Sequence, residues 1–253
     1  MARIRVRGVC ATYELLTVRD YNLKRRVLDL TSRRRHAPQT IDALRSVNLD
    51  LEEGTRLGLV GANGAGKSTL LSVMAGLLPP TAGRVDVDGR VLALLGGSSA
   101  GLDQEATGRD NIVSMGVQLG ETPAAMRRRA GEVIEFSGLG GRAEHPVYSY
   151  SSGMQARLRF SILTSLRPDV LLIDEGIGTA DAAFTAQASQ RLKQFVSSAG
   201  IVILASHGDD LLRQQCDTAA WLDRGVLRDR GPLESVLGAY HQSYESAVLD
   251  GTH

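Results

Sequence analysis

A short glycine-rich stretch carries the residues with the clearest chemical capacity in this chain. Residues 61–68 read Gly-Ala-Asn-Gly-Ala-Gly-Lys-Ser, and this spacing of glycines, a lysine and a hydroxyl suits the binding of a phosphate chain. The apolar residues 56–60 before it predict a strand. The apolar residues from Leu70 to Leu78 recur at helical spacing and predict a helix that stops at Pro79-Pro80. A strand, this loop and a helix in that order favour a phosphate-binding loop over a chance glycine-rich turn.

Each residue type in this loop has a physical reason to be there. Gly61, Gly64 and Gly66 permit backbone angles and a close approach to phosphate that a Cβ would block. We expect Lys67 to reach the β- and γ-phosphates of a triphosphate, and the Ser68 hydroxyl to ligate Mg²⁺. The N–H groups and the positive dipole end of the following helix add to the attraction for an anion.

Two adjacent acids follow the apolar run of residues 170–173. In an α/β sheet the carboxyl ends of the strands present the groups that bind ligands. Asp174 is therefore the expected partner of Mg²⁺, through water. Glu175 is then placed to orient or deprotonate the water that attacks the γ-phosphate. The alternative, an acidic pair that only caps the next helix, is less favoured once a phosphate-binding loop lies upstream.

A second serine- and glycine-containing stretch opens a predicted helix. Residues 150–154 read Tyr-Ser-Ser-Gly-Met, and Met154, Leu158 and Ile162 follow one another at intervals of four. Free N–H groups and serine hydroxyls at a helix start can hold an anion. By themselves, however, such residues most often form only an N-cap.

One of the five histidines also follows an apolar run. His207 comes directly after residues 201–206, at the expected carboxyl edge of the sheet. Its imidazole could hydrogen-bond a phosphate or orient Glu175. Taken alone, it is equally an ordinary loop histidine, as we expect for the other histidines.

The secondary structure that must position these residues is predicted to consist of strands in the first part of the chain, helices in the middle and further strands after it. Ile4 and Val6 alternate with arginines, which predicts an edge strand in residues 1–14. Residues 47–51 predict another strand, and residues 85–91 a pair of strands. Residues 98–166 are expected to form a helical subdomain.

Continuous apolar runs at residues 170–174 and 201–206 predict parallel strands that are buried on both faces. The segment between them carries Phe184, Ala188, Leu192 and Phe195 at helical spacing and can serve as a crossover helix. We expect one domain over residues 1–240 and a short polar tail over residues 241–253.

Residues 15–39 form a basic segment between the first two predicted strands. It contains seven Lys or Arg against two Asp, and Leu23, Val27 and Leu30 indicate a short amphipathic helix. The segment is either a functional insertion or a solvated helix that covers a sheet edge.

Composition narrows the class of protein. The 253 residues and 43% hydrophobic content suit a globular core, and a formal net charge of +1 does not suggest a nucleic-acid partner. Cys10 and Cys216 lie far apart, which argues against a disulfide scaffold or a zinc site and suits a reducing cytosol. No apolar run approaches the length of a membrane span, and the first residues lack the apolar core of a signal peptide. We therefore expect any membrane role to be peripheral.

The order of these motifs resembles that of the ATP-binding cassette (ABC) ATPases, from about residue 3 to 235. The resemblance implies an α/β fold, the P-loop NTPase nucleotide-binding domain, with a mixed or parallel sheet core, an antiparallel β subdomain and a helical subdomain. It implies ATP hydrolysis with ATP and Mg²⁺ as cofactors.

The resemblance also implies roles for single residues. Glu175 and His207, which matches the switch histidine, would be catalytic, and Ser68 and Asp174 would bind the metal. Tyr13 matches the aromatic residue that stacks on adenine, although an ordinary strand-end tyrosine is about equally consistent. The residues expected to bind nucleotide are Tyr13, Gly61, Asn63, Gly64, Ala65, Gly66, Lys67, Ser68, Thr69, Ser151, Gly153, Met154 and Asp181.

In this family the signature segment of one subunit completes the phosphate site of the other. The resemblance thus implies a homodimer with ATP at its interface, in which Ser151 and Gly153 contact phosphate and the loop ending at Asp181 crosses between subunits. Closure on ATP and reopening after hydrolysis would drive a membrane partner.

Residues 107–112, 150–160 and 181–184 are similar to the ATPase subunits of polysaccharide exporters, and so is the basic segment 15–39. This branch implies a separate polytopic membrane permease, a lipid-linked glycan as the transported substrate, and a location at the cytoplasmic face of the cell membrane. The alternatives are a soluble ABC ATPase outside transport and a nucleotide-switched scaffold. The short spacing between Lys67 and Ser151 argues against the first, and Glu175 with His207 against the second.

Two features depart from the family pattern. The glutamine expected shortly after Leu95 is replaced by Gly96-Gly97-Ser98, and Gln104 comes several residues too late. Metal coordination and coupling could therefore differ in detail. We also expect no carbohydrate-binding domain after the cassette.

Overall fold

The computed structural model of this chain describes residues 1–15, 39–95, 101–174, 185–206 and 208–249. Most of the basic segment, residues 16–38, lies outside the described residues. The strands are β1 (Arg3–Leu15), β2 (Gln39–Glu52), β3 (Arg56–Val60), β4 (Ala82–Asp88), β5 (Val91–Leu94), β6 (Val170–Asp174), β7 (Ile201–Ala205), β8 (Thr218–Asp223) and β9 (Val226–Pro232). The helices are α2 (Lys67–Met74), α3 (Gly108–Gln118), α4 (Pro123–Ser137), α5 (Ser152–Ser165), α6 (Thr185–Ser198), α7 (Asp209–Gln215) and α8 (Leu233–Leu249), with short 3-10 helices η1 (Gly140–Glu144) and η2 (Val147–Ser149).

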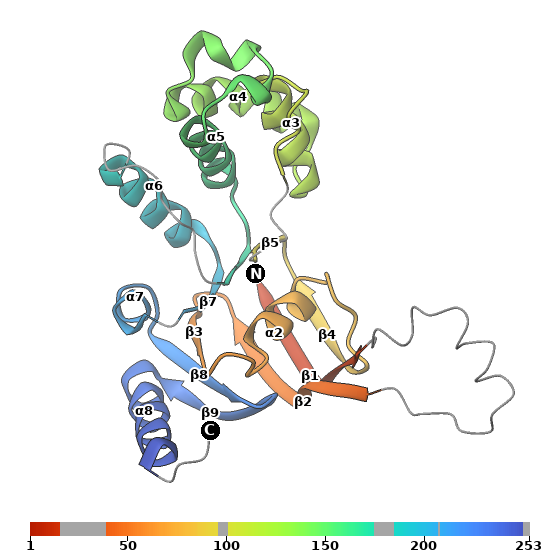
Figure 1. Cartoon of the computed structure of the whole chain (residues 1–253), viewed down its shortest axis with the longest axis vertical. Coiled ribbons are helices and arrows are strands. Elements are labelled where there is room, and N and C mark those ends of the chain that lie inside the picture. Colours follow the sequence, from red (N-terminus) through yellow and green to blue (C-terminus); the bar gives the residue numbers. More distant parts are fainter. Residues whose placement is uncertain (16–38, 96–100, 175–184, 207, 250–253) are drawn as a thin grey trace, which may run out of the picture.

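A six-stranded sheet forms the centre of the molecule, in the order β5-β6-β7-β3-β8-β9 (Figure 1). All neighbours are parallel except β8 and β9. Along β6, Val170 and Leu172 point into one core cluster and Leu171 and Ile173 into another. Both faces of the strand are therefore covered, which explains its continuous apolar run.

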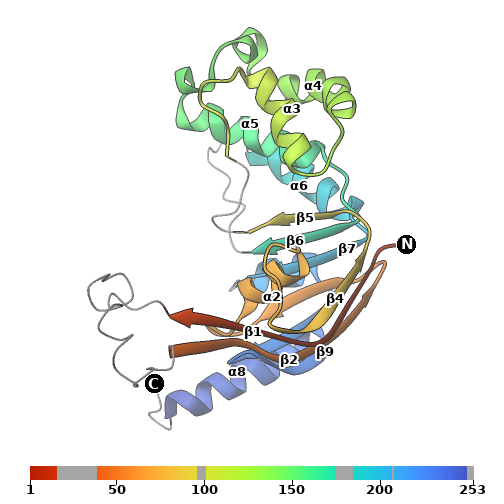
Figure 2. The same ribbon diagram turned by 90° about the vertical axis from the view of Figure 1, so that its right-hand side faces the viewer.

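The two faces of this sheet are covered by different elements. Helix α2 lies between the six-stranded sheet and a smaller three-stranded sheet, and buries Leu70, Leu71 and Met74 there (Figure 2). The opposite face packs against α6, α7 and α8 through Phe195, Leu212 and other apolar side chains. The parallel sheet thus carries the loop after β3 at its carboxyl edge, in front of α2.

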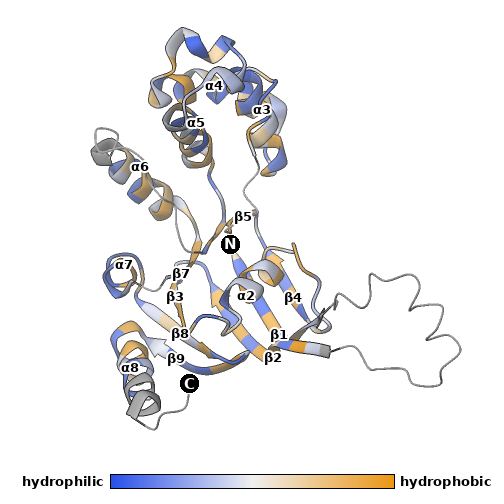
Figure 3. Ribbon diagram, in the orientation of Figure 1, coloured by the Kyte–Doolittle hydropathy of each residue, from blue (hydrophilic) through white to orange (hydrophobic). Residues whose placement is uncertain are grey.

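The three-stranded sheet has the antiparallel order β2-β1-β4, so β1 is its central strand. The prediction of an edge strand in residues 1–14 was wrong. Apolar and charged residues alternate along β1 (Figure 3). Two of its arginines lie in register with acids on both neighbouring strands: Arg3 with Glu52 and Asp88, and Arg5 with Asp50 and Asp86. Acids on β2 and β4 make an arginine-rich strand compatible with a central position.

Arg7 illustrates this pairing. Its Nη2 donates to Asp50 Oδ2 at 2.6 Å, and this hydrogen bond lowers the pKa of the Asp50 carboxyl below its ordinary value. Both side chains are largely exposed. Exposed ion pairs of this kind add little to stability, and this one is diagonal, since the register partner of Asp50 is Arg5.

The predicted strand pair within residues 85–91 was also wrong as a pair. β4 belongs to the three-stranded sheet and β5 to the six-stranded one. The chain crosses between the sheets at Gly89-Arg90, where the Arg90 N–H donates to Asp169 Oδ2 at 2.7 Å. This tertiary contact, just before β6, directs β5 to the large sheet.

Helices α3, α4 and α5 form a lobe beyond the β5 edge of the sheet (Figures 1 and 2). Thr107, Thr122 and Ser151 cap their three N-termini by accepting from backbone N–H groups. Asn111 on α3 is buried, and its amide bonds the backbone of Asp103 and Thr107. The helices predicted for this region are confirmed, and an anchored loop leads into them.

A buried carboxylate ties this lobe to the sheet. The side chain of Glu121 is 8% exposed, and its Oε1 accepts from Arg90 Nη1 at 2.6 Å and from Arg129 Nη1 at 2.8 Å. Burial by itself would raise the pKa of Glu121, but the hydrogen bonds from Arg129 and Arg90 outweigh it and hold the pKa below its ordinary value. The carboxylate is thus stabilised in its charged form.

We expect Glu121→Gln to lower the free energy of unfolding by roughly 1–3 kcal/mol, because it leaves two partly buried guanidinium groups without their anion. Chemical denaturation should show the loss at pH 7. Since the folded-state pKa of Glu121 is lowered, its contribution is complete above the ordinary glutamate pKa and is lost as pH falls through the lower folded value. The difference in free energy of unfolding between the wild type and Glu121→Gln should therefore disappear only at acidic pH.

Glu132→Gln on α4 is the matched control, because its carboxylate is 56% exposed and pairs with Arg191 near the surface. It should change stability by less than about 0.5 kcal/mol. Equal losses in the two variants at pH 7 would contradict the special role of Glu121.

Two further results concern the end of the chain and the membrane. Helix α8 runs through Tyr240 to Leu249, so the boundary expected after residue 240 falls within a helix. Within the described residues, no helix combines the length and apolar character that crossing a membrane requires.

Candidate nucleotide-binding site

The loop after β3 has the backbone geometry that its glycines predict. Gly61, Gly64 and Gly66 have φ values of 148°, 77° and 105°. A Cβ on Gly61 would collide with the carbonyl oxygen of Leu222, and one on Gly66 with that of Ala43. Strand β8 and strand β2 therefore press directly on the loop, and only glycine fits at these two positions.

Helix α2 starts at Lys67 without a side-chain cap, since it is preceded by Gly66 in the left-handed conformation. The N–H groups of its first turn are directed toward the loop and can bind an anion. The Lys67 side chain is largely buried, and its Nζ donates to the carbonyls of Gly61 at 2.6 Å and Ala62 at 3.1 Å. A phosphate held by the loop would lie beside this ammonium group.

A pocket of about 570 Å³ opens in front of the loop. It brings together nine of the predicted site residues, from three separate segments of the chain. These are Tyr13, Asn63, Gly64, Ala65, Gly66, Lys67, Ser68, Thr69 and Asp174. A strand of the small sheet, the loop, helix α2 and strand β6 therefore meet at one site.

Asp174 and Ser68 offer the oxygen ligands that Mg²⁺ prefers. Asp174 is the last residue of β6 and is half-buried, and Ser68 is the second residue of α2. One carboxylate and one hydroxyl suit an ion that takes its other ligands from water and phosphate. Among the described residues, no group of three or more His, Cys, Asp or Glu could hold a metal by itself.

Tyr13 reaches the pocket from the end of β1. Its ring is 42% exposed, and its hydroxyl lies 3.4 Å from Thr69 Oγ1 on α2. The exposed Ile41 on the paired strand β2 also lines the pocket. An aromatic face and an aliphatic side chain at one end of a phosphate-binding pocket suit a flat, partly apolar base.

Five pocket residues escaped sequence reasoning. They are Ile41, Asp42, Ala43, Arg45 and Arg224. The first four belong to β2, and Arg224 lies in the turn between β8 and β9. Only the pairing of strands brings them to the loop, and we find no motif that marks them in the sequence.

The serine-glycine segment does not reach this pocket. Ser151 is the N-cap of α5 and accepts from the Met154 N–H at 3.3 Å. Neither Ser151, Gly153 nor Met154 is among the described residues that line the pocket, and α5 belongs to the helical lobe (Figure 1). These three predicted nucleotide-binding residues therefore lie apart from the other nine in this structure.

Several predicted site residues fall outside the described residues: Glu175, Asp181 and His207, together with Gly96-Gly97-Ser98. Gln104 is described. Its Oε1 lies 3.3 Å from Gln155 Nε2 on α5, and it does not line the pocket. This position agrees with the view that Gln104 comes too late to replace the glutamine that the family pattern expects.

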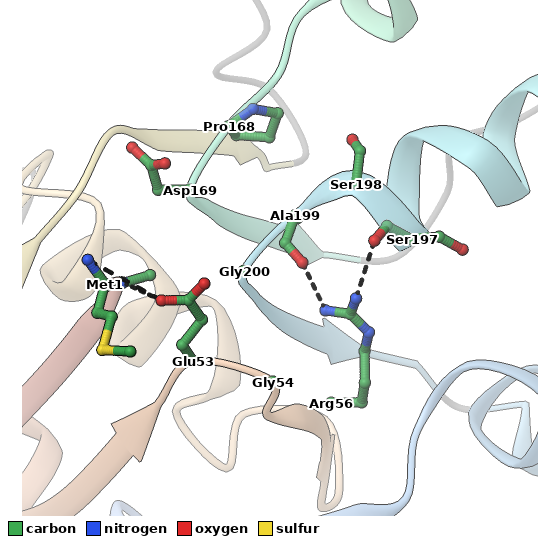
Figure 4. Close-up of a pocket in the computed structure, with 11 residues that line it drawn as sticks. Met1, Glu53, Gly54, Arg56, Pro168, Asp169, Ser197, Ser198, Ala199 and Gly200 are labelled. Carbon is green, nitrogen blue, oxygen red and sulfur yellow. Dashed lines mark hydrogen bonds and ion pairs between the residues drawn. The ribbon is translucent and has the colours of Figure 1, made fainter.

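A second hollow, of about 390 Å³, lies at the opposite, amino edge of the parallel sheet (Figure 4). Arg56 donates there to the carbonyls of Ala199 at 3.0 Å and Ser197 at 3.3 Å, at the end of α6. Glu53 accepts from the Ala2 N–H at 3.1 Å. These groups hold structural elements together, and the phosphate-binding loop lies at the other edge.

A parallel sheet with a left-handed glycine loop, an enclosed lysine and an uncapped helix start defines a P-loop nucleotide-binding protein. Residues 44–178 match the model of the ABC transporter family. The chain belongs to the ABC transporter family, whose members bind ATP.

Among curated proteins, the chain is 36% identical over 242 residues to the O-antigen export system ATP-binding protein RfbB of Myxococcus xanthus, covering 96% of this chain and 53% of that protein. It is 40% identical over 188 residues to RfbE of Yersinia enterocolitica, also named an O-antigen export system ATP-binding protein, covering 74% and 78%. The teichoic acids export ATP-binding protein TagH of Enterococcus faecalis is 35% identical over 229 residues, covering 89% and 51%. The chain thus spans about half the length of RfbB and TagH.

Solved structures confirm the fold class. The dimeric post-hydrolysis state of the ATP-binding cassette MJ0796, bound to ADP and Pi, superposes with a TM-score of 0.64 at 21% identity, covering 91% of this chain and 98% of that chain. The ATP-binding subunit of an ABC transporter gives a TM-score of 0.67 at 19% identity, covering 94% and 93%. The mixed sheet, the antiparallel β subdomain and the helical lobe are those predicted.

Proposed function

We propose that this chain is the ATP-hydrolysing subunit of an ABC exporter that energises translocation of a lipid-linked polysaccharide across the cytoplasmic membrane. The observation that carries the proposal is the pocket in which Lys67, the uncapped start of α2 and Asp174 converge. Such a pocket suits a nucleoside triphosphate and its metal. The exporter part rests on relatives that are named for O-antigen and teichoic acid export.

The residues of this chain have separate roles in the proposed reaction. The loop N–H groups and Lys67 bind the phosphate chain, and Tyr13 stacks on adenine. Mg²⁺, held by Ser68 and by Asp174 through water, would neutralise charge on the phosphates. Glu175 orients and deprotonates the attacking water, while His207 hydrogen-bonds phosphate or orients Glu175.

The chain works as a homodimer in this proposal. Ser151 lies on the helical lobe, outside its own nucleotide pocket, and its helix start offers N–H groups to an anion. A second copy facing the pocket would bring Ser151, Gly153 and Met154 onto the nucleotide, with Asp181 near the interface. Solved dimeric structures of the ATP-binding cassette MJ0796, which have a similar fold, support this arrangement.

A separate polytopic permease would carry the glycan, and this chain would act on it from the cytoplasmic face of the membrane. ATP binding closes the dimer and hydrolysis reopens it, so that the permease alternates between two states. The basic segment 15–39 would face the permease near the entry of the lipid-linked substrate. The names of the relatives support a glycan substrate class, which we extend to this chain as part of the proposal.

Reconstitution with a polytopic permease that co-purifies with this chain tests the proposal. Purified complex in lipid vesicles should hydrolyse ATP, and transfer of a lipid-linked glycan to the opposite leaflet should depend on ATP. The same vesicles carrying Lys67→Ala should do neither. Absence of hydrolysis both with and without the permease would indicate a nucleotide-switched scaffold, and hydrolysis without any ATP-dependent glycan transfer would refute the exporter assignment.

A further inference from the structure

The turn between β8 and β9 contains an arginine in a conformation that arginine rarely adopts. Arg224 has a φ of 47° and Gly225 a φ of 80°, so both central residues of this hairpin turn are left-handed. Turns of this kind normally carry Asn-Gly or Asp-Gly, because a left-handed conformation is unfavourable for a longer side chain. The arginine is therefore kept at a position where its own backbone preference opposes it.

One hydrogen bond fixes this turn to the phosphate-binding loop, and a second fixes it to β2. The Gly225 N–H donates to the Ala65 carbonyl at 2.9 Å, and the Gly225 carbonyl accepts from the Arg45 N–H at 2.8 Å. A Cβ on Gly225 would lie 2.8 Å from the Ala43 carbonyl oxygen, so the contact with β2 is also close. The turn is thus a wall of the nucleotide pocket, and Arg224 lines that pocket.

The positive charge of Arg224 has no protein partner in the part of the chain that the structure describes. Its side chain is exposed, and the adjacent Asp223 is used by another arginine: Arg228 donates to Asp223 Oδ2 from Nε at 3.2 Å and from Nη2 at 3.1 Å. Arg228 does not line the pocket. The hairpin therefore carries one arginine that is paired and one that faces the phosphate site.

Most of the other charged residues that line the pocket are paired with one another or assigned to the metal, so Arg224 can balance charge on a ligand. Asp42 and Arg45 lie 4.0 Å apart and compensate each other, and Asp174 is the expected metal partner. Lys67 and Arg224 remain to balance a polyphosphate, which carries several negative charges. A guanidinium group can donate two parallel hydrogen bonds to phosphate oxygens.

We propose that Arg224 binds the α- or β-phosphate of the nucleotide, from the β8–β9 turn that lines the pocket. The contact is placed at the α- and β-phosphates because the turn is bonded to Ala65, in the middle of a loop whose N–H groups hold these two phosphates. This inference rests on the proposed function, since it requires that the pocket binds a nucleoside di- or triphosphate. Binding of phosphate would explain why an arginine persists at a left-handed position.

The experiment measures the dissociation constants of ADP and ATP by isothermal titration calorimetry, together with the thermal midpoint of the nucleotide-free protein. Arg224→Asn is the main variant, because asparagine tolerates the left-handed conformation and removes the guanidinium group together with its aliphatic stem. Arg228→Asn is the matched control on the same hairpin. Lys67→Ala tests whether the pocket is the site where the nucleotide binds.

We expect Arg224→Asn to weaken ADP and ATP binding equally, by about 5- to 20-fold, the effect of one charge-assisted contact at a partly exposed site. Its thermal midpoint should equal or exceed that of the wild type by up to about 3 °C, because backbone strain is relieved. Arg228→Asn should leave both dissociation constants within about twofold.

Three outcomes would overturn the inference: unchanged affinity in Arg224→Asn, an equal loss in Arg228→Asn, or a loss accompanied by a lower thermal midpoint. A loss confined to ATP would also contradict it, since the contact would then be to the γ-phosphate. Failure of the proposed function looks different. In that case the wild type binds neither nucleotide, or Lys67→Ala binds both as well as the wild type.

Discussion

Glu175→Gln should slow ATP turnover by about 10²- to 10⁴-fold, the usual effect of removing a general base, while the dissociation constant for ATP stays within about twofold. Glutamine keeps the size of the side chain and its ability to accept a hydrogen bond from water, but it no longer takes up the proton. Glu175 directly follows Asp174, which ends β6 at the nucleotide pocket. The expected loss therefore concerns the chemical step and not binding.

Single-turnover measurements with saturating ATP separate an effect on the chemical step from an effect on ATP binding. The matched control is Glu132→Gln, which changes an exposed carboxylate on the helical lobe and should retain full turnover. Turnover by Glu175→Gln at the wild-type rate would refute the assignment of the base, and a large rise in the dissociation constant would show that Glu175 acts in binding.

The same variant offers a test of the dimer. Because ATP would remain intact, the closed state should accumulate, and light scattering should show twice the monomer mass with ATP but not with ADP. Ser151→Arg in this background should abolish the ATP-dependent dimer, since a large side chain would occupy the place of phosphate. A dimer that forms equally with and without nucleotide would contradict the shared site.

Lys67→Ala should raise the dissociation constant for ATP by about 100-fold. The Lys67 ammonium is largely buried beside the loop, and its Nζ is 2.6 Å from the Gly61 carbonyl oxygen. Charge-assisted contacts to two phosphates contribute roughly 3 kcal/mol together, which corresponds to this change in affinity. Calorimetric titration with ATP measures it directly.

Lys193→Ala is a suitable control, because Lys193 is exposed on α6. The substitution removes the same charge as Lys67→Ala does, but away from the pocket. It should bind ATP as the wild type does. The far-UV spectrum and thermal midpoint of Lys67→Ala should confirm that it folds. A folded Lys67→Ala protein with wild-type affinity would refute the phosphate-binding assignment.

The local part of the site could be predicted because its determinants are contiguous in sequence. Three glycines, Lys67 and Ser68 lie within eight residues between a strand and a helix, and the left-handed angles at Gly61, Gly64 and Gly66 follow from that spacing. Asp174 could be placed because parallel strands end at the same edge of a sheet. Apolar runs and periodic spacing likewise predicted strands at β1, β3, β6 and β7 and helices at α2, α5 and α6, whereas β8, β9, α7 and α8 were not predicted.

The sheet assignments depended on tertiary contacts. Alternating arginines in β1 indicated an edge strand, yet Arg3 and Arg5 lie opposite Asp or Glu residues on both β2 and β4. The contact between Arg90 and Asp169 separates β5 from β4, although the two are nearly continuous in sequence. Each of these partners is remote along the chain, so the local pattern carried no sign of it.

The sequence by itself determined the phosphate-binding loop, the family and the fold class, because these depend on local spacing and on an ordered series of motifs. The tertiary structure decided which other residues surround the nucleotide. Arg45 and Arg224 reach the pocket because β2 bonds to the β8–β9 turn, and this turn bonds to Ala65 of the loop. The tertiary structure also placed Ser151 on the helical lobe, away from the nucleotide pocket of the same chain. The packing of three helices determines this position, and the spacing of residues in the sequence does not.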